Sequence, residues 1–156
     1  MGNNLYIGAV NGIVLCVDGA DKTGFSGRLY HRFSAEPLGF DSMTGMLLEM
    51  EKLFDGIQFP RRGDRPRVFV KREEAQTEYK EKYMTDEELL EKHGQQQTFI
   101  VRVQHRQNST WQGQITWAEK NIKLNFRSVW EMVHMMENAI YEDIPEEEVP
   151  KVPEWE

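Results

Sequence analysis

Residues 109–140 read STWQGQITWAEKNIKLNFRSVWEMVHMMENAI, and this stretch decides the fold of the chain. Its apolar residues first alternate with polar ones, which is typical of β-strands, and then recur every three or four positions, which is typical of an amphipathic helix. Moved back by 86 positions (109 − 23 = 86), it aligns without a gap to residues 23–54. The alignment extends to residues 12–54 against 98–140 and contains eight identical pairs. We infer an internal duplication.

Each repeat predicts three strands followed by a helix. Ser42 and Ser128 are expected as N-caps, because a serine hydroxyl accepts a hydrogen bond from a free N–H of the first helical turn. Glu131 would complete a capping box with Ser128. In the second repeat the residues expected to face the helix are Phe99, Val101, Val103, Trp111, Gly113, Ile115, Trp117, Ile122, Leu124 and Phe126. The sequence therefore predicts an α+β fold of two β-β-β-α units, with an antiparallel sheet, both helices on one face and a pseudo-two-fold arrangement.

A connector and a tail complete the expected single domain of residues 1–156. The connector, residues 55–97, has no counterpart in the duplication. In it we expect a short strand over residues 68–70, and a short helix that begins with a capping box of Thr85 and Glu88. The tail, residues 141–156, carries seven acidic residues against one lysine and is expected to be extended.

The overall composition excludes several classes of protein. The net charge of −7 argues against general affinity for nucleic-acid phosphates or an anionic membrane surface. A single cysteine excludes an intramolecular disulfide framework and indicates a reducing compartment. The sequence shows no signal peptide and no apolar run that approaches the ~20 residues of a membrane helix. We expect a soluble cytoplasmic protein.

Reactive side chains form no recognisable catalytic or metal-binding pattern. Cys16 lies within a predicted strand, and the four histidines have no metal-ligand spacing. Trp111 and Trp117 are able to stack on a base, but their positions in the alternating strand pattern place them on the side that faces the core. We therefore predict no catalytic residue, no cofactor site and no metal site.

Two polar regions are the candidates for partner binding. Residues 61–72 carry six basic residues against one aspartate, and the expected solvent face of the second repeat is rich in amides. A solvated connector, or a dock for the acidic tail of the chain itself, is an equally good interpretation of the basic stretch. The candidate partner-binding residues are Arg61, Arg62, Arg65, Arg67, Arg102, Gln112 and Gln114.

Three runs and one tryptophan in the second repeat resemble an uncharacterised family of small bacterial proteins, seen mostly in Clostridia-like Firmicutes. They are FIVRV from Phe99, QNSTWQG from Gln107, Trp117, and FRS from Phe126. The first repeat, with GRLY from Gly27, resembles an N-terminal part that some members carry. The family has no assigned activity, so the resemblance implies a bacterial cytoplasmic protein and names no catalytic residue. In element order alone, the repeat is also similar to the fold of HicB-type antitoxins.

These observations predict a non-enzymatic protein-interaction or regulatory module. The alternative is a nucleic-acid-associated, antitoxin-like regulator that uses residues 61–72, although the overall acidity counts against it. An enzyme is a third hypothesis, and it needs a pocket that gathers residues scattered along the sequence. We expect a protein partner, no membrane contact, no cofactor, and either a monomer or a weak homodimer.

Overall fold

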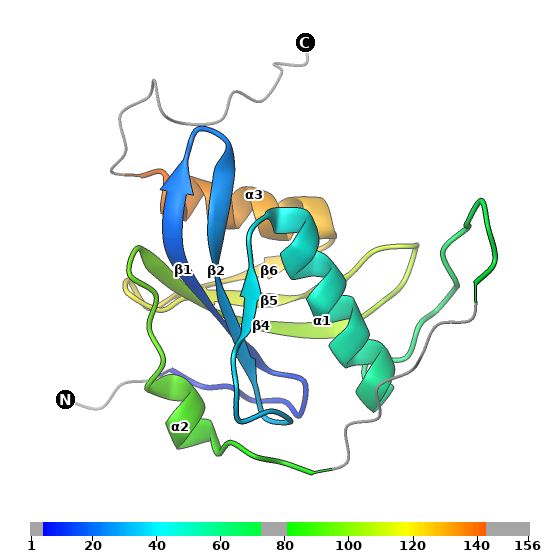
Figure 1. Ribbon diagram of the computed structural model, residues 1–156, viewed down its shortest axis with the longest axis horizontal. Helices are drawn as coiled ribbons and strands as arrows, with labels where there is room; N and C mark the ends of the chain where they lie inside the picture. The colour runs from blue at the N-terminus through cyan, green and yellow to red at the C-terminus, as the bar shows by residue number, and fades with distance from the viewer. Residues whose placement is uncertain (1–4, 73–80, 143–156) are drawn as a thin grey trace.

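The computed structural model describes residues 5–72 and 81–142, which form an antiparallel β-sheet covered by helices (Figure 1). The elements in these residues are β1 (Ile13–Asp21), β2 (Gly24–His31), β3 (Leu38–Phe40), α1 (Met43–Ile57), α2 (Asp86–Leu90), β4 (Gln97–His105), β5 (Gln112–Trp117), β6 (Ile122–Phe126) and α3 (Val129–Ile140). The strand order is β3-β2-β1-β4-β5-β6, so β1 and β4 form the centre and β3 and β6 the edges. The predicted α+β class and antiparallel sheet are confirmed.

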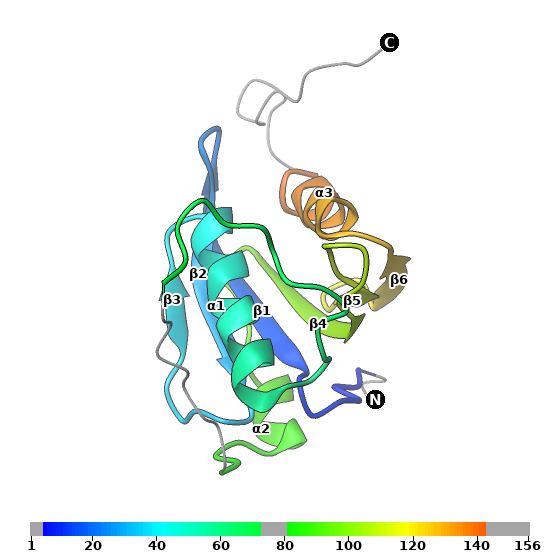
Figure 2. The same ribbon diagram turned by 90° about the vertical axis from the view of Figure 1, so that its right-hand side faces the viewer.

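The two long helices cover different parts of the sheet, and their buried side chains join one core (Figure 2). Helix α1 contacts β2 and β3, and α3 contacts β4, β5 and β6. Ser42 caps α1 and Ser128 caps α3, each by accepting a hydrogen bond of 3.1 Å from a backbone N–H three residues later. Most of the apolar residues expected along one side of each helix are buried, whereas Met43, Leu47 and Val129 are only partly buried at its border; the helices share one core with the inward side chains of the central strands. The fully buried members of this core include Ile13, Leu15, Val17, Met46, Met50, Leu53, Phe54, Val101, Met132 and Met136.

The opposite face of the sheet is only partly open to solvent. There Leu89 of α2, Met84 and Ile7 pack on a second apolar cluster that also contains Val14, Cys16, Tyr30 and Ile100. We expected this second face of the sheet to be exposed to solvent. At the centre of the sheet it is buried instead, because the connector and the N-terminal segment cover it. Burial raises the pKa of the Cys16 thiol to about 11, so this cysteine stays protonated and unreactive at neutral pH.

Strand β6 differs from the prediction in its burial. Ile122 is 47 % exposed and Leu124 is 50 % exposed, although both were expected in the core. Leu124 pairs with the buried Ile115 and therefore shares its face of the sheet. However, β6 is the edge strand, and the cover provided by the helix layer does not extend over these two side chains. Phe126, at the end of β6 nearest α3, is buried as expected.

Local details correct several other expectations. Residues 68–70 form no strand and are exposed. The short helix with its Thr85 capping box is confirmed. The second capping box is only half formed, because the Glu131 carboxylate accepts from the backbone N–H of Arg127 and not from that of Ser128. The predicted extended tail lies outside the described residues from position 143 on, and Tyr141 is buried.

Candidate partner-binding surface

A network of charged side chains fixes the chain where it leaves α1. The Arg106 side chain, only 5 % exposed, donates to the Asp55 carboxylate at 2.6 Å and to the carbonyl of Pro60 at 2.8 Å. Arg62 donates two further hydrogen bonds to Asp55, at 2.8 Å and 2.5 Å. The backbone N–H of Gly63 donates to the Arg106 carbonyl at 2.9 Å. Together these bonds attach residues 60–63 to the outer end of β4.

The same network sets the charge state of Asp55. Burial raises the pKa of this carboxyl, but the hydrogen bonds and charges of Arg62 and Arg106 outweigh burial and lower the pKa below its ordinary value of 3.8. Arg62 also lies 3.2 Å from Glu51. Arg62, which the sequence nominates for partner binding, is therefore engaged within the molecule.

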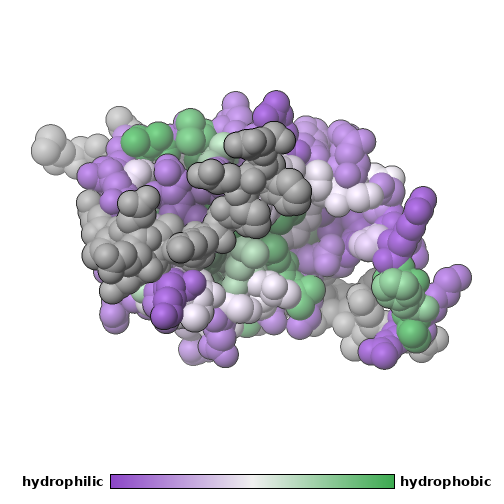
Figure 3. Space-filling view, turned by 90° about the horizontal axis from the view of Figure 1, so that it is seen from above, coloured by the Kyte–Doolittle hydropathy of each residue, from purple (hydrophilic) through white to green (hydrophobic). Residues whose placement is uncertain are grey.

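Beyond this anchor the chain projects from the body. We call residues 61–72 the basic arm; its first three residues belong to the anchor, and the rest project. It stands clear of the helices at the right of Figure 1. From residue 63 onward all its residues are exposed, and Phe69 is fully exposed between Val68 and Val70. In the space-filling view the arm shows apolar side chains flanked by hydrophilic ones (Figure 3). Arg61, Arg65 and Arg67 form no ion pair with another residue in the described ranges.

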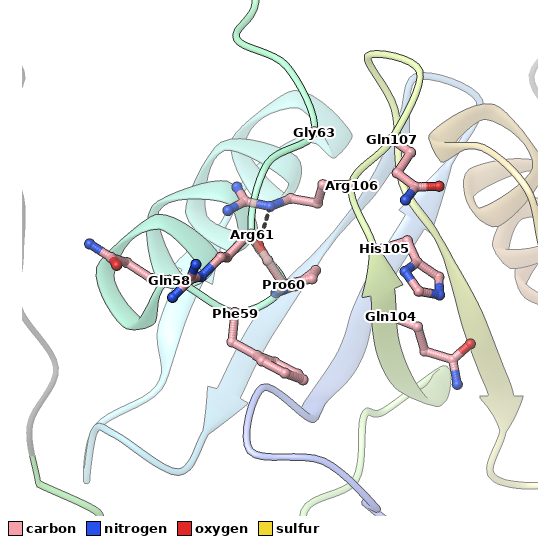
Figure 4. Close-up of a pocket in the computed structure, with 9 residues that line it drawn as sticks. All are labelled: Gln58, Phe59, Pro60, Arg61, Gly63, Gln104, His105, Arg106 and Gln107. Atoms are coloured by element: carbon pink, nitrogen blue, oxygen red, sulfur yellow. Dashed lines mark hydrogen bonds between the residues drawn. The ribbon is translucent and has the colours of Figure 1, made fainter.

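A surface pocket of about 390 Å³ adjoins the base of the arm (Figure 4). The segment after α1 forms one side of it, and the end of β4 with the loop that follows forms the other. The lining residues are Gln58, Phe59, Pro60, Arg61, Gly63, Gln104, His105, Arg106 and Gln107. The charge of Arg106 is already paired with Asp55, but Arg61, a histidine and three glutamines remain and no carboxylate lines the pocket, so the pocket suits an anionic group. We call it the Phe59 pocket.

The remaining candidates from the sequence lie elsewhere. Arg102 and Gln114 hydrogen-bond to each other across β4 and β5, on the face opposite to α3, and the Arg102 guanidinium lies 5.9 Å from the centre of the Tyr6 ring. The Gln112 amide accepts from the N–H of Gln107 at 3.1 Å and donates to its carbonyl at 2.8 Å, which braces the β4–β5 loop. The structure therefore does not bring the seven candidate residues together at one site.

Sequence reasoning missed the pocket entirely. Phe59 and His105 are far apart in the chain, and neither belongs to a recognisable motif. The pairing of residues 61–63 with the end of β4 creates the pocket, and no periodic pattern encodes that pairing. The only usable sequence signal was the run of arginines.

The described part of the chain offers little support for other kinds of site. It contains no group of three or more histidine, cysteine, aspartate or glutamate side chains arranged to hold a metal ion. None of its helices is both long and apolar enough to cross a membrane. Comparison of the chain with protein-family models, with curated proteins and with solved structures gives no match.

Proposed function

We propose that this protein is a non-enzymatic interaction module whose basic arm captures an acidic protein partner. The observation that carries the proposal is a fully exposed Phe69 between two exposed valines, preceded by Arg65 and Arg67, which form no ion pair with any other residue that the structure describes. Aromatic residues and arginine are the side chains enriched at the energetic centres of protein interfaces. Exposed apolar side chains of this size gain free energy only when a partner covers them.

The composition of the arm favours a protein over a nucleic acid. Phosphate contacts use the arginines alone, and stacking on a base uses Phe69. Val68 and Val70 contribute to neither kind of contact, whereas both fit an apolar groove on a protein. The net charge of −7 repels a long polyanion such as a nucleic acid, whereas an acidic protein partner needs to contact only the arm.

The Phe59 pocket extends the same surface. Arg61 belongs to both the arm and the pocket, and His105 stands on the opposite wall. We place a carboxylate side chain of the partner in this pocket, beside His105, with the glutamine amides as further donors. The pocket therefore supplies selectivity for acidic residues, and Phe69 supplies the apolar anchor.

We also infer that the six-stranded sheet, with its two long helices, is a duplicated scaffold with pseudo-two-fold symmetry. The shift of 86 relates Val14 to Ile100 (14 + 86 = 100), and these two residues pair with each other at the centre of the sheet. It also relates the pair Val17–Gly27 to the pair Val103–Gly113. A Cβ added to Gly27 would lie 1.9 Å from a backbone carbonyl oxygen of the neighbouring strand, and one added to Gly113 would lie 2.0 Å from the equivalent oxygen. The arm belongs to the connector, which has no counterpart in this symmetry.

The proposed role of the arm is tested by selecting, from a random display library, peptides that bind the full-length chain. We expect enrichment of peptides that combine aspartate or glutamate with aliphatic or aromatic residues. Phe69→Ala should weaken binding of a selected peptide by at least about tenfold. The matched control is Leu48→Ala, because Leu48 is also an exposed apolar residue but lies on α1.

Two outcomes would count against the proposal. Selected peptides that bind the Phe69→Ala variant as tightly as the parent chain would place the binding surface elsewhere. Fluorescence anisotropy with a random single-stranded RNA tests the alternative: binding that weakens steeply with added salt and requires Arg65 and Arg67 would favour the nucleic-acid regulator.

A further inference from the structure

The edge strand β6 presents an apolar strip that nothing in the described structure covers. Ile122 and Leu124 are each about half exposed on the helix side of the sheet. Met135 of α3 is only partly buried and packs at the border of the core. The ion pair of Arg127 and Glu131, at 2.7 Å, fixes one flank of α3 beside the end of β6, and Met135 lies one turn further along that flank.

We propose that β6 pairs antiparallel with β6 of a second copy of this chain, about a two-fold axis at Leu124. The pairing continues the six-stranded sheet into the second copy and uses the free backbone groups of the edge strand. The two-fold operation places Leu124 opposite Leu124, Ile122 opposite Phe126, and Lys123 opposite Asn125. Apolar residues therefore meet apolar residues on the helix side, and the lysine meets an uncharged amide on the other side.

The charges on β6 favour this register over its neighbours. The apolar strip stays on the helix side only if the pairing shifts in steps of two residues, because neighbouring side chains along a strand point to opposite faces. A two-fold axis at Lys123 places the two lysines opposite each other. An axis at Asn125 places Lys123 opposite Arg127. Like charges that face each other directly are destabilising, so both shifted registers are disfavoured.

The other sheet edge makes a poorer surface for a second copy. Strand β3 has only three residues, Leu38–Phe40, against the five of β6. Pairing β6 with β3 of another copy would also be head-to-tail, which leads to open-ended assembly instead of a closed dimer. In Figure 2 the basic arm starts beside the end of β4 and crosses in front of α1 towards β3, so its outer part lies away from β6. A β6-paired dimer therefore leaves both arms accessible, and the proposal stands independently of what the arm binds.

Sedimentation velocity of the full-length chain, from low to several hundred micromolar, tests the proposal. We expect a concentration-dependent dimer. Leu124→Asp should raise its dissociation constant by more than about tenfold, because it brings two carboxylates together at the axis. Leu48→Asp is the matched control, since Leu48 is 53 % exposed on α1. A chain that stays monomeric throughout, or two variants with equal effects, would overturn the proposal.

Cysteine cross-linking tests the register and does not depend on how well Leu124→Asp folds. Residues directly opposite in an antiparallel pair have Cα atoms ~4.5–5.5 Å apart, which a disulfide spans. Under mild oxidation Leu124→Cys should therefore form a covalent dimer, and Leu48→Cys should not. Cys16 does not compete, because it is buried. A failure of Leu124→Cys to cross-link, or equal cross-linking of both variants, would refute pairing at Leu124.

Discussion

Replacing Asp55 by alanine should destabilise the fold through Arg106. The Arg106 guanidinium is almost fully buried and has Asp55 as its anionic partner at 2.6 Å. Removing one partner of a buried ion pair costs about 3–5 kcal/mol, because the other charge stays buried without compensation. The Asp55 side chain is 28 % exposed, so water replaces part of the interaction and we expect about 3 kcal/mol. For a chain of this size that loss lowers the melting temperature by roughly 6–12 °C.

Urea unfolding at neutral pH, followed by tryptophan fluorescence, measures this effect. Trp111 is a suitable reporter because its ring lies 5.3 Å from that of Phe54 in the core. Asp64→Ala is the control, since exposed Asp64 accepts a hydrogen bond only from the hydroxyl of Ser109 among the described residues and should cost under about 0.5 kcal/mol. Equal losses for the two aspartate variants would refute the reasoning.

The ion pair of Asp55 and Arg106 also predicts how the stability of the fold depends on pH. The pKa of Asp55 is lowered in the folded protein, so its contribution to stability is present above the unfolded pKa near 4 and is lost as the pH falls through the folded pKa. The difference in unfolding free energy between the parent chain and Asp55→Ala should therefore shrink in acid. Asp55→Ala combined with Arg106→Met should recover part of the loss, because no charge then remains buried.

The remaining predictions concern the core, the tail and the duplication. Met136→Ala should cost about 2–5 kcal/mol in urea unfolding, because Met136 is fully buried, whereas Leu48→Ala on the exposed side of α1 should be nearly neutral. Truncation after Tyr141 should leave the melting temperature nearly unchanged, and a large drop in calorimetry would show that the acidic tail docks on the body. A fragment of residues 95–156 is too small to cover its own sheet edge, so in ultracentrifugation it should be unfolded or a homodimer that imitates the intact chain. A stable, cooperatively melting monomer would show that the two repeats fold independently.

Local periodicity was sufficient to locate most secondary structure. The alternation around Ile115 and the helical spacing of Met132 and Met136 are properties of a few adjacent residues, and each appears in the structure where the sequence placed it. The caps at Ser42 and Ser128 were predictable for the same reason, since a cap bonds to backbone only three residues away.

The candidate surface was predictable only in part. The arginines of residues 61–72 are visible in the sequence, but the structure shows that they make different contacts. Arg62 donates hydrogen bonds to Asp55, whereas Arg65 and Arg67 are exposed. Which arginine turns inward depends on where residues 61–63 meet the end of β4. That contact joins segments more than forty positions apart, so no local pattern predicts it.

The sequence by itself therefore determined most of the strands, the helices and the apolar side of each, although not the strand expected over residues 68–70. Only the tertiary structure decided what lies against those sides. Leu124 lies on the same face of the sheet as Ile115 yet is half exposed, because it sits on an edge strand. Cys16 lies on the face opposite the two long helices yet is buried, because the connector and the N-terminal segment cover it. The physical reason is that periodicity fixes the direction of a side chain within its element, whereas burial depends on a second segment that the chain brings from far away.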